Sequence, residues 1–135
     1  MPENLIETMW IFHAALMTLG FVLIFIGFFF IFMRKRAQWL KPAHKVIEII
    51  GPLFAAVGLA VGIYMTSDEH FEALHDYLGV ITLIFIVVCP ALGIARSRIP
   101  RNALVKALHR WWSVITVALM LATLISGIVM ELEGG

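Results

Sequence analysis

Residues 9–33 read MWIFHAALMTLGFVLIFIGFFFIFM, twenty-five residues with one histidine and no charged side chain. An α-helix needs about 20 mostly apolar residues to cross the hydrocarbon core of a bilayer. Three further runs, at residues 46–65, 74–95 and 108–130, have a similar length and character. The chain has 135 residues, of which 61% are hydrophobic and 14% charged. Soluble domains are far less apolar, so we predict an all-α integral membrane protein.

The four runs leave little chain between them, which predicts a single domain over residues 1–135. Short connections favour an up-down four-helix bundle. The predicted helices span about residues 8–33, 43–66, 72–95 and 103–130. The N-terminus lacks the positive charge of a secretory signal, so we expect the first span to stay in the mature protein. The single cysteine, Cys89, excludes an internal disulfide and a thiolate metal cluster.

Charge is distributed unevenly along the chain. All ten Lys and Arg residues fall within 34–45 and 96–110, whereas all the acidic residues except Glu48 fall near the opposite ends of the predicted helices. The positive-inside rule then places the first and third loops in the cytoplasm and both termini on the non-cytoplasmic side. A plasma or inner membrane is expected, and no nucleic-acid partner. Membrane insertion alone also explains this asymmetry, which therefore does not by itself indicate a function.

Each predicted helix carries one histidine, and successive histidines are 31, 31 and 34 residues apart. His13 and His75 lie near the outer ends of their helices, and His44 and His109 near the inner ends. Helices one and three, and helices two and four, are diagonal partners in an up-down bundle. With neighbouring axes ~8–10 Å apart, a diagonal is roughly 11–14 Å, which suits two imidazoles and an iron. The sequence thus predicts two bis-histidine haems b, one near each face.

A single histidine in a membrane helix is more often a hydrogen-bonded packing residue or a proton relay than a metal ligand. Pairing by depth favours ligation. Small residues also recur on the histidine-bearing face of every helix, where a porphyrin needs room; close helix packing is the alternative reason for them. From these faces we select four cofactor-binding candidates: Gly20, Gly51, Gly79 and Ser113.

Two segments resemble the cytochrome b561 family. Residues 12–21, FHAALMTLGF, resemble its His-x-x-Leu-Met-x-x-Gly-Phe segment. Residues 70–79, HFEALHDYLG, resemble its Ser-Leu-His-Ser-Trp-Leu-Gly motif, with Ala73, Asp76 and Tyr77 in place of Ser, Ser and Trp. Residues 41–45 and 108–112 match more loosely, chiefly through their histidines.

The resemblance implies an ascorbate-linked transmembrane cytochrome in which these four histidines ligate two haems in the same diagonal pairs. Typical eukaryotic members have six spans, of which the present four resemble the core. The four-helix bacterial cytochromes that share the name carry two ligands on one late helix, and fit less well.

We therefore expect electron transfer from a cytoplasmic reductant, ascorbate-like or a quinol, to an acceptor or partner protein outside, such as ferric iron. The class would be a transmembrane oxidoreductase of the cytochrome b561 type. The interior-negative membrane potential favours this direction by ~2.3 kcal/mol per charge per 100 mV. Candidate substrate residues are Lys41, Lys45, Lys106 and Arg110 at the inner rim and His70 at the outer rim.

Two of the ionisable residues have open interpretations. His70 is an acceptor-site or proton-exchange group, or a solvated loop residue. Glu48 lies one turn from His44 on the same face. It either pairs with Lys45 or Arg110, or couples proton uptake to reduction of the inner haem.

Other functions also remain open. The chain could be a haem-bearing anchor subunit of a larger redox complex, for which its short loops are suited. It could also be a haem-free transporter or assembly factor whose histidines handle protons or metal ions, although this explains the pairing by depth less well. Besides membrane lipid, a second copy of the chain is a candidate partner.

Overall fold

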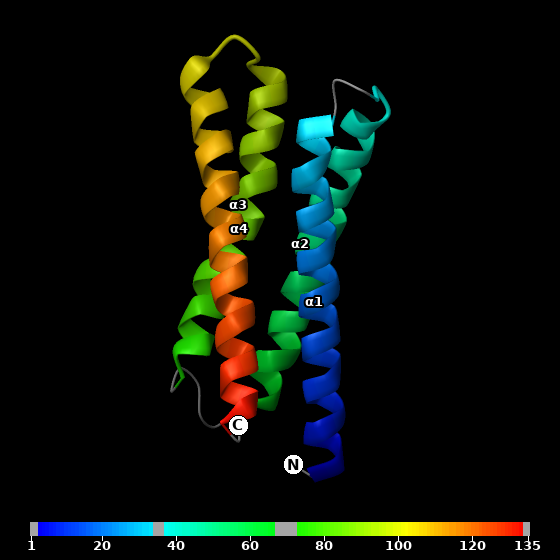
Figure 1. Ribbon diagram of the computed structural model, residues 1–135, viewed down its shortest axis with the longest axis vertical. Coiled ribbons are helices and arrows are strands. Elements are labelled where there is room, and N and C mark those ends of the chain that lie inside the picture. Colours follow the sequence, from blue (N-terminus) through cyan, green and yellow to red (C-terminus); the bar gives the residue numbers. More distant parts are fainter. Residues whose placement is uncertain (1–2, 34–36, 67–72, 134–135) are drawn as a thin grey trace.

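The structure, a computed structural model, describes residues 3–33, 37–66 and 73–133. These residues form four α-helices and no strand: α1 (Glu3–Met33), α2 (Leu40–Met65), α3 (Leu74–Arg98) and α4 (Ala103–Leu132). Each helix is long and apolar enough to cross a membrane. They run along the long axis of the molecule, with both chain ends at the same end (Figure 1). The predicted all-α four-helix fold is confirmed, whereas the sidedness of the termini stays a prediction.

The helix ends differ by a few residues from those expected. The α1 helix already begins at Glu3, and α2 begins at Leu40, so that Pro42 lies within its first turn. Proline costs little there, because the first backbone N–H groups of a helix have no intrahelical acceptor. At the start of α4, Asn102 Oδ1 accepts a hydrogen bond from Val105 N at 3.1 Å. This is a typical N-cap that fixes where α4 begins.

The bundle consists of two helical hairpins. The α1 helix packs closely against α2, and α3 against α4, while contacts of α2 with α3 and of α1 with α4 are much sparser. The diagonal partners, α1 with α3 and α2 with α4, have no close backbone contact in the described residues. This is the order of an up-down bundle. We call α1–α2 the first hairpin and α3–α4 the second hairpin.

The two helices within each hairpin are held together by different contacts in the two hairpins. In the first, Gly20 and Gly51 let the backbones approach so closely that a Cβ atom on Gly20 would lie 2.9 Å from Gly51 O. In the second, the hydroxyls of Thr82 and Thr123 lie 2.7 Å apart across the interface. Close approach at small residues and hydrogen bonds between helices are the main devices for packing helices in membranes.

Between the two ends of the bundle lies a layer of buried, mostly apolar side chains. Ile86 of α3 and Met120 of α4 are almost completely buried, at 1% and 0% exposure. They belong to one cluster with residues of the first hairpin, Met17, Phe21, Ile24 and Ala55. This layer separates the two ends of the interior from each other.

Candidate functional sites

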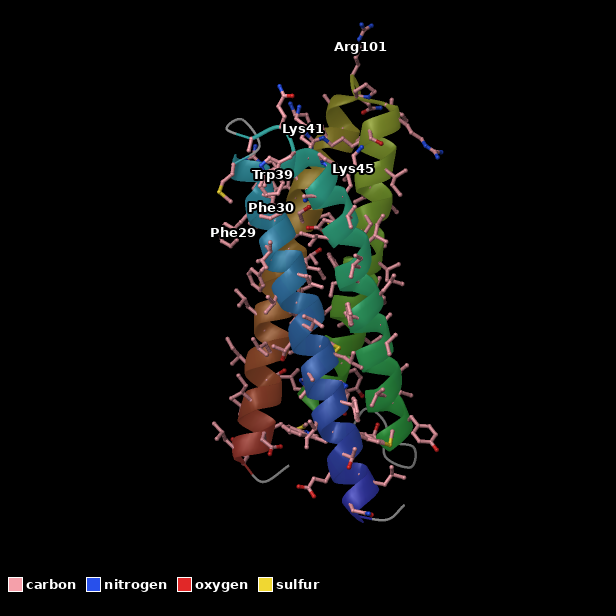
Figure 2. The ribbon with its side chains drawn as sticks, turned by 90° about the vertical axis from the view of Figure 1, so that its right-hand side faces the viewer. Phe29, Phe30, Trp39, Lys41, Lys45 and Arg101 are labelled. Atoms are coloured by element: carbon pink, nitrogen blue, oxygen red, sulfur yellow. The ribbon has the colours of Figure 1, made fainter. Side chains whose placement is uncertain are left out.

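Two cavities of about 350 Å³ each lie within the bundle. We call the one toward the chain termini the acidic-end cavity, since its lining includes His13, His75, Asp76 and Glu131. The other is the basic-end cavity, whose lining includes Lys41, His44, Lys45, Glu48, Arg96 and His109. Lys41, Lys45 and Arg101 lie together at one end of the bundle, away from the N-terminus (Figure 2). Each cavity thus contains one diagonal pair of histidines.

His13 of α1 and His75 of α3 face each other across the acidic-end cavity. Their ring centroids are 6.3 Å apart and their planes are inclined by 86°. A metal bound by a histidine nitrogen at about 2.0–2.1 Å lies roughly 3.2 Å from the ring centre, so two trans histidines have centroids about 6.4 Å apart. The observed separation of the ring centroids is close to this value.

Hydrogen bonds to backbone carbonyls orient three of the four rings. His13 Nδ1 lies 2.7 Å from Gly58 O, and His44 Nδ1 lies 2.8 Å from Gly27 O. His75 Nδ1 lies 3.2 Å from Thr123 O. A carbonyl oxygen only accepts, so each Nδ1 is the protonated donor and Nε2 keeps its lone pair. That is the tautomer in which a neutral histidine binds a metal through Nε2.

Glycines on neighbouring helices make the space for these rings. A Cβ atom on Gly62 would lie 2.8 Å from His13 Nδ1, and one on Gly127 would lie 2.9 Å from His75 Cε1. On the other side, a Cβ on Gly93 would lie 3.3 Å from His109 Cε1. These glycines are not among the site residues predicted from the sequence. Each occupies the histidine-bearing face of its own helix, which is the signal that could have found them.

His109 is 7% exposed and lines the basic-end cavity together with His44. Its Nδ1 atom is buried and has no hydrogen-bond partner in the described part of the chain. Buried polar atoms are nearly always satisfied, and an exception calls for an explanation. The backbone of Cys89 on α3 interacts with this ring, so a small movement would supply the missing acceptor.

The four small residues selected from the sequence have different positions. Gly79 lines the acidic-end cavity. Gly20 and Gly51 lie against each other in the first hairpin. Ser113 lies one turn from His109, donates to its carbonyl oxygen at 2.7 Å, and lies 3.2 Å from Cys89 Sγ. Gly79 thus lines a cavity, whereas the other three have roles in helix packing or hydrogen bonding.

Glu48 projects into the basic-end cavity, with 13% of its side chain exposed. Its Oε1 lies 3.7 Å from His44 Nδ1. Among the described residues Glu48 forms no ion pair with Lys45 or Arg110. The sequence offered those two cations as partners, and the structure places the carboxylate beside the histidine instead.

The candidate substrate residues fall into two groups according to whether they line this cavity. Lys41 and Lys45 line the basic-end cavity, whereas Lys106 and Arg110 are exposed and do not. Arg96 and Ser97, which the sequence patterns did not single out, line this cavity too. The sequence feature that could have found them is their position one turn beyond Gly93 on the same helix. His70 lies outside the described residues.

The family model for eukaryotic cytochrome b561 matches residues 12–133. The chain belongs to the cytochrome b561 family, as the resemblance of its histidine motifs predicted. No curated protein and no solved structure matches the chain. The four spans and the family membership make it an integral multi-pass membrane protein. Membership of this family indicates haem-dependent transmembrane electron transfer.

The residues of the cavities fit a haem of the b type. No cluster of three or more His, Cys, Asp or Glu side chains able to hold a metal ion occurs in the described residues. Two facing imidazoles alone need further donors to complete a coordination sphere. Haem would supply the remaining donors, and the paired histidines of the two cavities would hold it.

Proposed function

We propose that the chain carries electrons across the membrane by means of two bis-histidine b-type haems, from a reductant at the basic end to an acceptor at the acidic end. The observation that carries the proposal is the separation of 6.3 Å between the rings of His13 and His75. His44 and His109, which line the second cavity, are the second ligand pair. Haem supplies one-electron chemistry that no amino-acid side chain here provides.

The chain's own residues hold and orient this centre. The Nδ1 bonds to Gly58 O and Gly27 O fix the rings of His13 and His44 and leave the lone pair on Nε2. The buried layer around Ile86 and Met120 keeps water out of the space between the cavities. An ion has no hydrated path through such a layer, whereas an electron needs none.

The charges at the two ends suit different substrates. Lys41, Lys45 and Arg96 attract an anionic donor such as ascorbate to the basic end, and Asp76 and Glu131 attract a cation such as ferric iron to the acidic end. A quinol is the alternative donor. If the basic end is cytoplasmic, the membrane potential assists electron flow toward the acidic end.

The deciding experiment is a pyridine haemochrome assay on the purified protein, with reduced-minus-oxidised spectra after addition of ascorbate. We expect two low-spin b haems per chain, reducible by ascorbate. One haem per chain would contradict the two-site proposal, and no haem after expression with ample haem would contradict the function altogether. Two haems without turnover of ascorbate and a ferric chelate would instead favour the anchor subunit of a larger complex.

A further inference from the structure

The two hairpins each contain an inverted repeat. In the first hairpin, His13 and His44, Gly20 and Gly51, and Gly27 and Gly58 are three pairs 31 residues apart. Their contacts are reciprocal, because His13 Nδ1 bonds to Gly58 O and His44 Nδ1 bonds to Gly27 O. An exchange of α1 with α2 therefore reproduces the same contacts. Gly20 and Gly51 replace each other in this exchange, so their contact lies at the centre of the repeat.

The second hairpin repeats in the same way with an offset of 34 residues. His75 and His109 are one such pair, and Gly93 and Gly127 another. Gly127 lies against the ring of His75, and Gly93 against the ring of His109. Exchanging both helix pairs therefore exchanges the acidic-end cavity with the basic-end cavity. Inverted repeats of this kind are a common architecture of membrane proteins.

The repeat shows which residues make the two cavities different. The residue of α1 one turn from His13 is Met17, and its image one turn from His44 is Glu48. Both occupy the same place, since Met17 packs against Gly58 and Glu48 packs against Gly27. Met17 is buried and apolar, and it lines the acidic-end cavity. An apolar side chain therefore satisfies the packing at this position.

Membrane insertion does not explain the carboxylate of Glu48. The other charged residues at this end are basic, as the positive-inside rule requires, and Glu48 has the opposite sign. An ionisable side chain within a membrane bundle is costly and usually marks a function. What distinguishes Glu48 is its neighbour, the axial-ligand candidate His44, 3.7 Å away.

We propose that Glu48 is a positioning residue that acts through His44 and lowers the reduction potential of the basic-end site. In its ionised form, the Glu48 carboxylate beside the ligand candidate His44 would stabilise the oxidised state, which carries one more positive charge than the reduced state. Lys41, Lys45 and Arg96 line the same cavity and act in the opposite sense. The two lysines are exposed, so water and salt screen them, whereas Arg96 is half-buried and offsets part of the effect of Glu48. The contribution of Glu48 favours electron flow away from the basic end, toward the site with Met17. The inference rests on the proposed function.

Spectroelectrochemical titration of the purified holoprotein tests this inference. We expect Glu48→Gln and Glu48→Met to raise one of the two midpoint potentials and leave the other in place. Met17→Glu should lower that other midpoint, because it places the carboxylate at the image position. Glu7→Gln removes an exposed acid of α1 that lines neither cavity, and should move neither midpoint.

The outcomes separate the inference from the function on which it rests. Unchanged midpoints in Glu48→Gln, at full haem content, would overturn the role of Glu48 while two haems in the unmodified protein still supported electron transfer. Equal shifts of both midpoints would overturn it too. If Glu48→Met fails to retain haem, Met17→Glu still decides, since an unlowered midpoint in that variant contradicts the proposal.

Discussion

Backbone carbonyls hold most of the histidine rings in the two cavities, and His75 Nδ1 has a side-chain contact as well, with Ser126 Oγ at 3.1 Å. Carbonyl oxygens of Gly58, Gly27 and Thr123 hold three of the Nδ1 atoms. Such acceptors cannot be removed by a point mutation, so the orientation of a ring is changed either by removing the ring or by filling the space beside it. Both kinds of change give predictions at the level of single residues.

Replacing a single ligand should remove a single haem. In His75→Ala we expect the haem content to fall from two per chain to one, because His13 is left without its partner across the acidic-end cavity while His44 and His109 are untouched. The pyridine haemochrome assay measures this ratio directly. His70→Ala, five residues away in sequence, is the control and should keep two haems. Retention of both haems in His75→Ala would contradict the assigned pair.

A methyl group beside a ligand should also weaken its site. In Gly127→Ala the new Cβ atom would lie 2.9 Å from His75 Cε1, so the ring must move. Disturbed ligand orientation typically costs 10–100-fold in metal affinity, and we expect a loss of about tenfold or more in haem affinity at this site. Haem release to an excess of apomyoglobin measures the change. Ala122→Val adds bulk to the exposed face of the same helix and should release haem as the unmodified protein does.

At the scale of helices, the first hairpin depends on the close contact at Gly20. A Cβ atom there would lie 2.9 Å from backbone atoms of both Gly51 and Ala55, which cannot yield as a flexible side chain can. We expect Gly20→Ala to lower the free energy of unfolding by about 1–3 kcal/mol through overpacking. Denaturation in mild detergent with increasing SDS, followed by circular dichroism, measures it. Leu19→Ala, at an exposed neighbour, should have a much smaller effect, and equal losses would argue against the contact.

Sequence periodicity located the helices and brought His13 and His75 to one cavity, because a helix face and the order of four short-looped helices follow from spacing alone. Periodicity did not show whether a given helix face contacts another helix or lines a cavity. Gly20 and Gly79 both lie on histidine-bearing faces, yet Gly20 contacts α2 and Gly79 lines a cavity. Backbone acceptors such as Gly58 O also leave no trace in the sequence, since every residue has a carbonyl.

The partner of Glu48 was hard to predict for a related reason. Lys45 and Arg110 are close in sequence or depth, but their side chains are long and exposed. A lysine gains more by reaching water than by entering a membrane bundle. The carboxylate, which is shorter, remains beside His44.

At the scale of the whole molecule, the charge pattern predicts its orientation in the membrane. We expect the end with Arg101 to face the cytoplasm and the end with Glu133 to face outward. In a Cys89→Ser background, a membrane-impermeant maleimide applied to intact cells should label Glu133→Cys and spare Arg101→Cys until the cells are opened. The reverse labelling would invert the topology and, with it, the direction of electron flow that the membrane potential assists.

The two hairpins meet each other only sparsely, and each pair of facing histidines takes one residue from either hairpin. If the proposed histidine pairs hold haem, the cofactor adds a link between the two hairpins beyond the apolar cluster around Ile86 and Met120. A chain made while haem is scarce would have fewer contacts between its two hairpins, and we expect membrane proteases to degrade it more readily. The amount of this protein in a cell should accordingly follow the supply of haem, even when its synthesis is constant.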